Sequence, residues 1–283
     1  MKGYSVCFAI FVWETVVLST IASAQHSDVL VADVGGKVAV GDASNIDAPG
    51  ETFDLDTRVF ESILRGGFSH PTLAADYEAV EPGFFALHSV SHTSELASLG
   101  ASALPGDAAV SLNLSSFSVD GDVASLFYWN GIGPVDFDPA PAGADFGFKP
   151  PGSFATTGAN GDLDDHPVFQ VDNGGAGAPA DGVYLIAQSI DVAGLATSDR
   201  FFVVLLVDQL IDTEDDVEDL EVALEALEAG NGETAFLDGK DFAFYEAAVE
   251  YVETNIAIPE PSAGLLSLAA CGLIALCRFR VVS

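Results

Sequence analysis

Short runs of alternating apolar and polar residues, separated by glycine, aspartate, asparagine and proline, occupy the chain from residue 25 to residue 212. Alternation with a period of two is typical of β-strands, because successive side chains point to opposite faces of a sheet. The clearest pair of runs lies at 28–34 and 37–41. These runs flank Gly35-Gly36, a dipeptide that favours the two-residue turn of a β-hairpin.

Further runs extend this β pattern to the end of the region. The last of them contains FFVVLLV, a continuous apolar run that predicts a strand covered on both faces. We therefore expect a mainly β protein, with a β-sandwich or jelly-roll-like ectodomain over 25–212. The proline-rich stretch 136–153 is expected to be irregular. The further strands are expected at 84–89, 109–119, 123–129, 167–172, 182–191 and 200–208, with a turn at Asp120-Gly121-Asp122 between the second and third.

After Asp212 the spacing of apolar residues changes to that of an α-helix. Thr213 is placed to cap a helix with an acidic first turn, where the helix dipole favours anions, and Gly230 is suited to end it. A second helix is expected at 241–255. Residues 213–256 are thus predicted to form a short α-helical hairpin, either a stalk or cap or, alternatively, a coiled-coil oligomerisation element. The apolar stripes are Val217, Leu220, Leu224 and Leu227, then Phe242, Tyr245, Val249 and Val252.

The charge of the chain excludes one class of function. Asp and Glu number 43 against 9 Lys and Arg, which gives a formal net charge of −34 at pH 7. Such a surface repels phosphates, so binding to DNA or RNA is excluded. It suits a solvated extracellular protein, or one that takes up divalent cations through its carboxylates.

The three cysteines all lie in the hydrophobic ends of the chain, at Cys7, Cys271 and Cys277. The region between them has no cysteine, so it cannot be held together by disulfides and must fold on its own core. It also offers no thiol nucleophile and no thiolate metal ligand.

The N-terminal end has the order of features of a signal peptide over residues 1–24. Lys2 supplies the positive start, an apolar stretch follows at 6–21, and Ala22 and Ala24 form a small-x-small cleavage site for signal peptidase. Glu14 is unusual within such an apolar stretch. An N-terminal membrane anchor is the alternative.

The C-terminal end, residues 257–283, contains three features in a fixed order. Pro259, Glu260 and Pro261 come first and predict an extended, protease-accessible segment, because proline cannot continue a helix. An apolar run at 263–277 follows and predicts a C-terminal transmembrane helix, although it is short for a span. Arg278 and Arg280 come last and would hold the end in the cytoplasm.

This order resembles the PEP-CTERM sorting signal of Gram-negative bacteria that make exopolysaccharide. The resemblance implies that an exosortase removes the tail near the Pro-Glu-Pro triplet, after transient anchoring in the inner membrane. The body would then reach the cell surface, the outer membrane or an extracellular matrix. An ordinary single-pass anchor that is retained is the alternative.

A second resemblance rests on three short motifs, PGF at 82–84, LFYWNG at 126–131 and GVYLIAQSI at 182–190. Their order is similar to that in uncharacterised β-rich secreted proteins of planctomycetes. This resemblance implies a type of fold but no activity.

Calcium is the cation that the sequence favours most. Asn160, Asp162, Asp164 and Asp165 place oxygen ligands close together with an early glycine, in a loop before a strand. The segment 172–181 could complete such a site. The glutamate that closes an EF-hand loop is missing, because its position holds Val171. A solvated acidic loop without calcium is the alternative.

Histidines and a tryptophan suggest other sites. His88 and His92 lie four residues apart, but an extended strand would separate them by about 13 Å. A metal site of His88, His92 and His166 therefore needs a turn between the first two, and His26 is a further possible ligand. Trp129 could stack on a sugar if it were exposed, although burial in the core is the expected use.

No nucleophile motif or isolated pair of carboxylates points to catalysis. The sequence therefore predicts a non-enzymatic surface or matrix protein with a structural or adhesive role. A calcium- or carbohydrate-binding surface module is the first alternative, and a secreted polysaccharide-active hydrolase is the second. Exopolysaccharide is the possible partner outside the cell.

Overall fold

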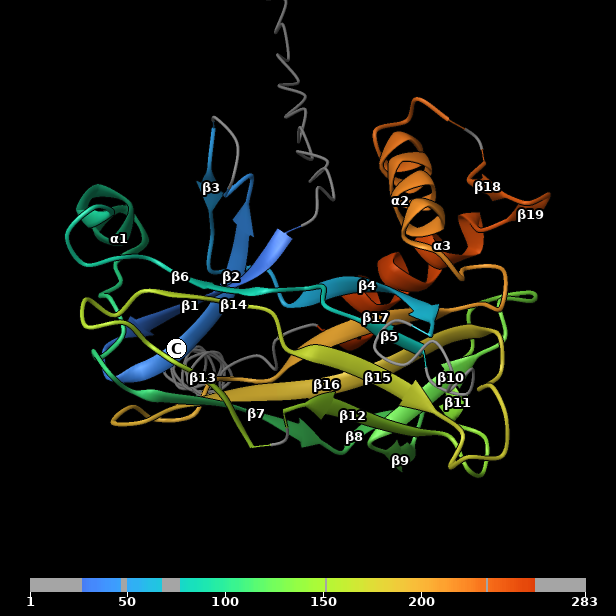
Figure 1. The fold of residues 1–283 in the computed structure, drawn as a ribbon, viewed down its shortest axis with the longest axis horizontal. Helices are drawn as coiled ribbons and strands as arrows, with labels where there is room; N and C mark the ends of the chain where they lie inside the picture. Colours follow the sequence, from blue (N-terminus) through green and yellow to red (C-terminus); the bar gives the residue numbers. More distant parts are fainter. Residues whose placement is uncertain (1–26, 47–49, 68–76, 151, 233, 258–283) are drawn as a thin grey trace, which may run out of the picture.

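The computed structural model describes residues 27–46, 50–67, 77–150, 152–232 and 234–257. Most of the regular structure in these ranges is strand, so the predicted mainly β class is confirmed. The larger of two sheets lies along the long axis, and the helices lie toward the top of the view in Figure 1.

The larger sheet has ten strands. Its centre is β16 (Gly182–Val192) and β17 (Phe201–Val207), and β17 pairs in parallel with β4 (Val59–Gly66). The remaining strands are β11 (Asp138–Pro139), β10 (Leu126–Trp129), β5 (Tyr77–Ala79), β15 (Val168–Asp172), β12 (Asp145–Lys149), β7 (Ala109–Ser115) and β13 (Ser153–Thr156).

The smaller sheet has five strands in the order β14-β6-β1-β2-β3. Its hairpin of β1 (Ser27–Val34) and β2 (Lys37–Ser44) turns at Gly35 and Gly36, as expected, and both glycines have positive φ angles. The other strands are β3 (Thr52–Phe53), β6 (Phe84–Ala86) and β14 (Leu163–Asp165). Two small hairpins stand apart, β8 (Phe117–Val119) with β9 (Asp122–Ala124), and β18 (Phe236–Leu237) with β19 (Lys240–Asp241).

Strand β17 divides the core in two. All seven of its residues are buried, as its apolar run predicts. Phe201 and Val203 belong to a core between the two sheets, where they join Val29 and Phe84 of the smaller sheet. The alternate residues of β17, such as Val204, face the other way into a second core, which the sheet forms with the helices.

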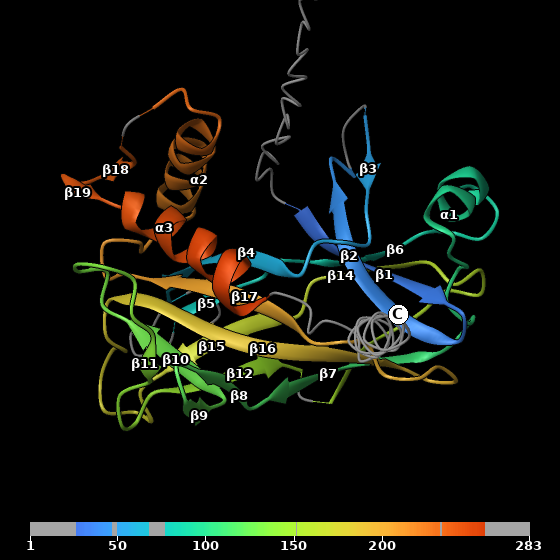
Figure 2. The same ribbon diagram turned by 180° about the vertical axis from the view of Figure 1, so that it is seen from behind.

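The second core is closed by α2 (Glu214–Glu228), α3 (Ala243–Tyr251) and the π-helix η1 (Val252–Ile256). Thr213 caps α2 in a capping box with Asp216, which confirms the expected start of this helix. The Tyr245 hydroxyl accepts a hydrogen bond from Ser62 N at 3.0 Å and donates to Val204 O at 2.9 Å. The helical hairpin thus lies on the sheet as a cap (Figure 2).

Several boundaries differ from those expected. The strand predicted at 84–89 ends at Ala86, and α1 (Thr93–Leu99) follows shortly after it. The runs at 109–119 and 123–129 each divide into two strands. The stretch 136–153 is not wholly irregular, because it contains β11 and β12. Four further strands were not expected, namely β4, β5, β13 and β14. Each is fixed by pairing with a strand that is distant in the sequence, which a local pattern does not reveal.

Among the helices of the described ranges, none combines the length and the apolar character that crossing a membrane requires. The predicted transmembrane run at 263–277 lies outside the described residues. So do the predicted signal peptide and, apart from Ala257, the predicted sorting signal.

Candidate functional site

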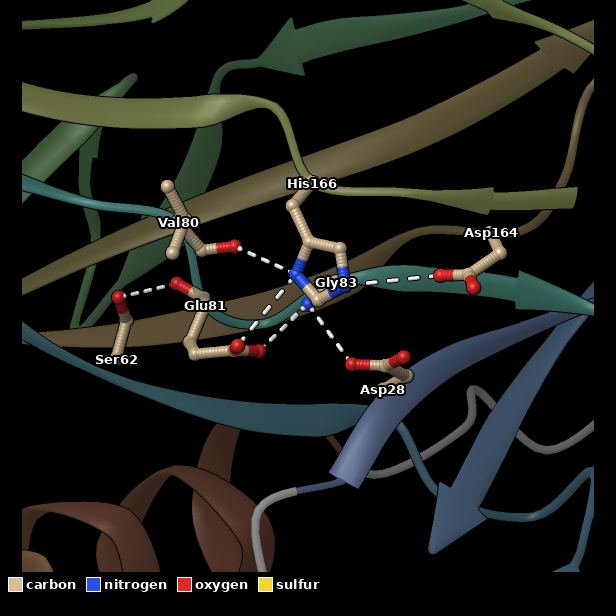
Figure 3. A network of polar contacts seen from close by, with 7 residues as sticks. All are labelled: Asp28, Ser62, Val80, Glu81, Gly83, Asp164 and His166. Carbon is tan, nitrogen blue, oxygen red and sulfur yellow. Dashed lines mark hydrogen bonds and ion pairs between the residues drawn. The ribbon is translucent and has the colours of Figure 1, made fainter. Parts of the chain in front are cut away.

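Two chain segments pass from one sheet to the other at the same place. The first joins β5 of the ten-stranded sheet to β6 of the five-stranded sheet, and the second joins β14 to β15 in the opposite direction. Because β5 pairs with β15 and β6 pairs with β14, the two crossings run side by side. Glu81 lies on the first crossing and His166 on the second (Figure 3).

The His166 ring lies between acidic side chains. Its Nδ1 atom lies 3.4 Å from Glu81 Oε1 and 3.3 Å from the carbonyl oxygen of Val80, whereas its Nε2 atom lies 3.7 Å from Asp164 Oδ1. The Ser62 hydroxyl, on β4, donates a hydrogen bond to the Glu81 carbonyl oxygen and so holds the first crossing against the larger sheet.

Asp28, near the start of β1, is the third side chain beside Glu81 and His166. Its side chain is only 6% exposed, and its carboxylate points toward the Glu81 and His166 side chains (Figure 3). Asp28 Oδ1 accepts a hydrogen bond from Gly83 N at 3.1 Å, and Gly83 N also donates to Glu81 Oε2 at 3.0 Å. Asp28 Oδ2, in contrast, is buried without a hydrogen-bond partner. We call Asp28, Glu81 and His166 the crossover cluster.

Gly83 makes the close approach possible. A Cβ atom at this position would lie 2.4 Å from His166 Cε1 and 2.6 Å from Asp28 Oδ1, distances at which atoms clash. The absence of a side chain thus lets the imidazole and the carboxylate converge over the backbone.

The electrostatics of the crossover cluster follow from burial and proximity. Burial, reinforced by the charge of Glu81, raises the pKa of Asp28 to about 6. The hydrogen bond with Glu81 raises the pKa of His166 to about 9, against the opposing effect of desolvation. At neutral pH without a bound cation, His166 is therefore an imidazolium that partly neutralises its acidic neighbours.

A second group of acidic side chains lies between the larger sheet and the helices. Glu61 on β4, Glu228 at the end of α2 and Glu246 on α3 bring carboxylate oxygens within 4.8 Å of one another. Burial raises the pKa of Glu61 well above its usual value and that of Glu246 to about 8, and neighbouring carboxylates add to both shifts. We call these three residues the glutamate cluster.

None of the four predicted calcium ligands is a member of either cluster, although Asp164 lies beside the crossover cluster, with Oδ1 3.7 Å from His166 Nε2. Asn160 Nδ2 lies 2.9 Å from His88 Nε2, and the Asp162 carboxylate lies against Gly158. Asp164 and Asp165 are consecutive residues of β14, so their side chains leave opposite faces of the strand. In the described part of the chain, the two groups of three potential metal-ligating acidic or histidine side chains are the crossover cluster and the glutamate cluster. Calcium at 160–165 stays a prediction.

The histidine pair is closer than expected. A turn after β6 brings His88 and His92 together, and His88 N donates a hydrogen bond to His92 Nδ1 at 3.1 Å. The separation expected for an extended strand was therefore wrong. The ring of His88 accepts from the backbone at Nδ1 and faces Asn160 at Nε2, whereas His166 lies in the crossover cluster.

Trp129 is buried and packs edge-on against Phe244, as expected for a core residue, so it offers no face to a sugar. The remaining predicted residues lie outside the described ranges. These are His26, the cleavage residues Ala22 and Ala24, and the sorting residues Pro259, Glu260, Pro261, Arg278 and Arg280.

Sequence reasoning did not connect Asp28, Glu81 and His166, which are distant in the chain. The sequence feature nearest to this cluster is the Pro82-Gly83 dipeptide between two apolar runs. It predicts a turn but does not indicate a metal-binding residue. Comparison of the chain with known proteins found no matching family model, no matching curated protein and no matching solved structure.

Proposed function

We propose that this chain is an exported cell-surface or matrix protein with a structural or adhesive role and no catalytic activity. Signal peptidase acts after Ala24, the C-terminal helix anchors the chain in the inner membrane, and an exosortase then releases the body near Pro259–Pro261. The delivered body is a β-sandwich-like domain with a helical cap, and exopolysaccharide is its possible partner.

The observation that carries this proposal is that the described chain stays packed against the second core up to Ala257. Ile256 and Ala257 still contact the second core, and Pro259 follows two residues later. Cleavage at the Pro-Glu-Pro triplet would therefore leave the cap and both large cores intact. The extended segment that the sequence predicts at the triplet would be accessible to a membrane-bound processing enzyme.

Charge supports the same function. The net charge of −34 keeps the molecules apart in solution and disfavours contact with anionic surfaces. An adhesive role in a matrix would then depend on bridging cations or on neutral polysaccharide.

Mass spectrometry of the mature protein from its native host tests the proposal. We expect an N-terminus created after Ala24 and a C-terminus near Pro259–Pro261. Replacing both prolines with alanine should leave the tail attached, whereas the control Glu250→Gln, at an exposed position before the motif, should be processed normally. A wild-type protein that retains residues 263–283 would contradict the proposal.

A further inference from the structure

We propose that Asp28, Glu81 and His166 bind a divalent transition-metal ion, which joins the two sheets at the crossover cluster. This site is independent of whether the chain is exported and processed.

The geometry is close to that of a bound ion. One potential ligand atom from each of the three side chains lies within 4.8 Å of the other two. Ligands placed about 2.0–2.2 Å from a common ion lie roughly 3–3.5 Å apart. Glu81 Oε1 and His166 Nδ1, 3.4 Å apart, already have this separation, and the Asp28 atom needs to close by at most about 1–2 Å. Glu81 and His166 are each partly exposed and can make that movement by side-chain rotation, while Asp28 provides a fixed inner wall.

The unpartnered oxygen of Asp28 is the second observation. More than nine-tenths of this side chain is buried, yet Oδ2 has no hydrogen-bond donor. A buried carboxylate oxygen without a donor is unfavourable, and buried polar atoms of this kind are usually satisfied by water or an ion. A cation bound to the Asp28 carboxylate would compensate its charge, which no donor at Oδ2 does in the described residues, and would offset the repulsion between the Asp28 and Glu81 carboxylates.

The ligand types select the class of metal. Imidazole nitrogen together with two carboxylates suits Zn²⁺, Mn²⁺, Fe²⁺ or Co²⁺, whereas Ca²⁺ prefers six to eight oxygen ligands. His166 Nδ1 faces Glu81 and Nε2 faces Asp164. Asp164 is thus placed as an outer partner that orients the imidazole through the nitrogen that does not bind the metal.

The location gives the ion a structural task. Asp28 belongs to the five-stranded sheet, and Glu81 and His166 lie on the two crossings to the ten-stranded sheet. One ion would therefore tie β1 to both crossings, in a domain whose body has no cysteine for a disulfide.

Isothermal titration calorimetry of the full chain in detergent micelles, with Zn²⁺ as the probe, tests the site. After treatment with EDTA and buffer exchange, we expect one Zn²⁺ per chain. Asp28→Asn, Glu81→Gln and His166→Gln should each weaken binding more than 10-fold, and Asp164→Asn should weaken it about 10-fold. The controls Asp138→Asn and His88→Gln change residues of the same types outside the cluster and should bind as the wild type does.

A spectroscopic measurement keeps the test decisive if a variant does not fold. In the wild-type chain labelled with ¹⁵N-histidine, Zn²⁺ should shift the ring-nitrogen signals of His166 and leave those of His88 and His92 unchanged. The proposal is overturned if Zn²⁺ does not bind with unit stoichiometry, if it shifts His88 and His92 instead, or if Ca²⁺ competes with Zn²⁺ at equal concentration.

Discussion

The crossover cluster and the glutamate cluster both hold carboxylates close together, but they differ in how the repulsion between these carboxylates is reduced. Each brings three ionisable side chains within 4.8 Å, and each draws them from elements that are distant in the sequence. The crossover cluster contains a histidine between its carboxylates, whereas the glutamate cluster contains carboxylates alone. Buried carboxylates can relieve their mutual repulsion by staying protonated and therefore neutral. A histidine between carboxylates can relieve the same repulsion by becoming a positively charged imidazolium.

This difference shows that ionised side chains at similar separations can either stabilise or destabilise the folded state. At neutral pH and without metal, the imidazolium of His166 stabilises the fold, since it is favoured by the carboxylates around it. Ionised Glu61 or Glu246 destabilises the fold, because burial and the neighbouring charges favour the neutral forms. Removing one group from each cluster should therefore change stability in opposite directions.

The largest effect is expected for His166→Gln in EDTA. The pKa of His166 rises from 6.5 to about 9 on folding, so its contribution is fully present below pH 6.5 and is lost as the pH rises through 9. We expect a loss of about 2 kcal/mol in the free energy of unfolding at pH 6.5, less than for a fully buried pair because the ring is partly exposed. Urea denaturation of the variant and the wild type at pH 6.5 and pH 10 measures this loss. An equal loss at both pH values would contradict the ionic explanation.

Glu246→Gln should have the opposite sign. The pKa of Glu246 rises from 4.5 to about 8 on folding, so the wild type loses stability as the pH rises through that window. Glutamine cannot ionise, and we expect the variant to be more stable than the wild type by about 1–2 kcal/mol at pH 8.5 and equal to it at pH 4. Thermal melting at the two pH values checks this, with Glu250→Gln on the exposed side of the same helix as the control. A destabilised variant at pH 8.5 would show that the glutamates are held by a cation instead.

Tyr245→Phe tests the hydrogen bonds that the Tyr245 hydroxyl makes close to the glutamate cluster. The hydroxyl of Tyr245 bonds to Ser62 N and Val204 O in the second core, so its removal takes an acceptor from Ser62 N and a donor from Val204 O. We expect a loss of about 1–1.5 kcal/mol that does not depend on pH between 5 and 8, in contrast to both cluster variants. Urea denaturation across this range is the measurement. A loss that grows with pH would tie the hydroxyl to the ionisation of Glu61.

Asp164→Asn should have the smallest effect on the metal-free protein. The Asp164 side chain is 70% exposed and lies 3.7 Å from His166 Nε2, so this pair is weak in water. We expect a change of about 0.5 kcal/mol or less at pH 6.5, well below that of His166→Gln. Comparison of the two melting curves in EDTA measures the difference, and equal losses would show that Asp164 and not Glu81 is the main partner of the imidazole.

Local features of this fold were predictable from the sequence. The turn at Gly35-Gly36, the cap at Thr213 and the doubly covered strand that became β17 each depend on neighbouring residues. The turn that brings His88 and His92 together was missed, because the apolar run before it continued the strand pattern.

The candidate site was not predictable in the same way. Strands β5 and β14 have three residues each, too few to show a period, and they are fixed by pairing with distant strands. His166 was identified as a possible ligand, but its partners depend on where the two crossings meet. The glutamates of the second cluster could not be distinguished from the many other acidic residues of the chain.

Strand β17 has a consequence for folding. Its seven residues are apolar, rich in β-branched and aromatic side chains, and uncharged, which is the composition of a segment prone to self-association when unprotected. Its neighbours β16 and β4 shield both of its edges, but the parallel pairing with β4 joins distant parts of the chain and forms slowly. Arg200 and Asp208, the charged residues at its two ends, are therefore placed as gatekeepers that limit aggregation until β4 is in position.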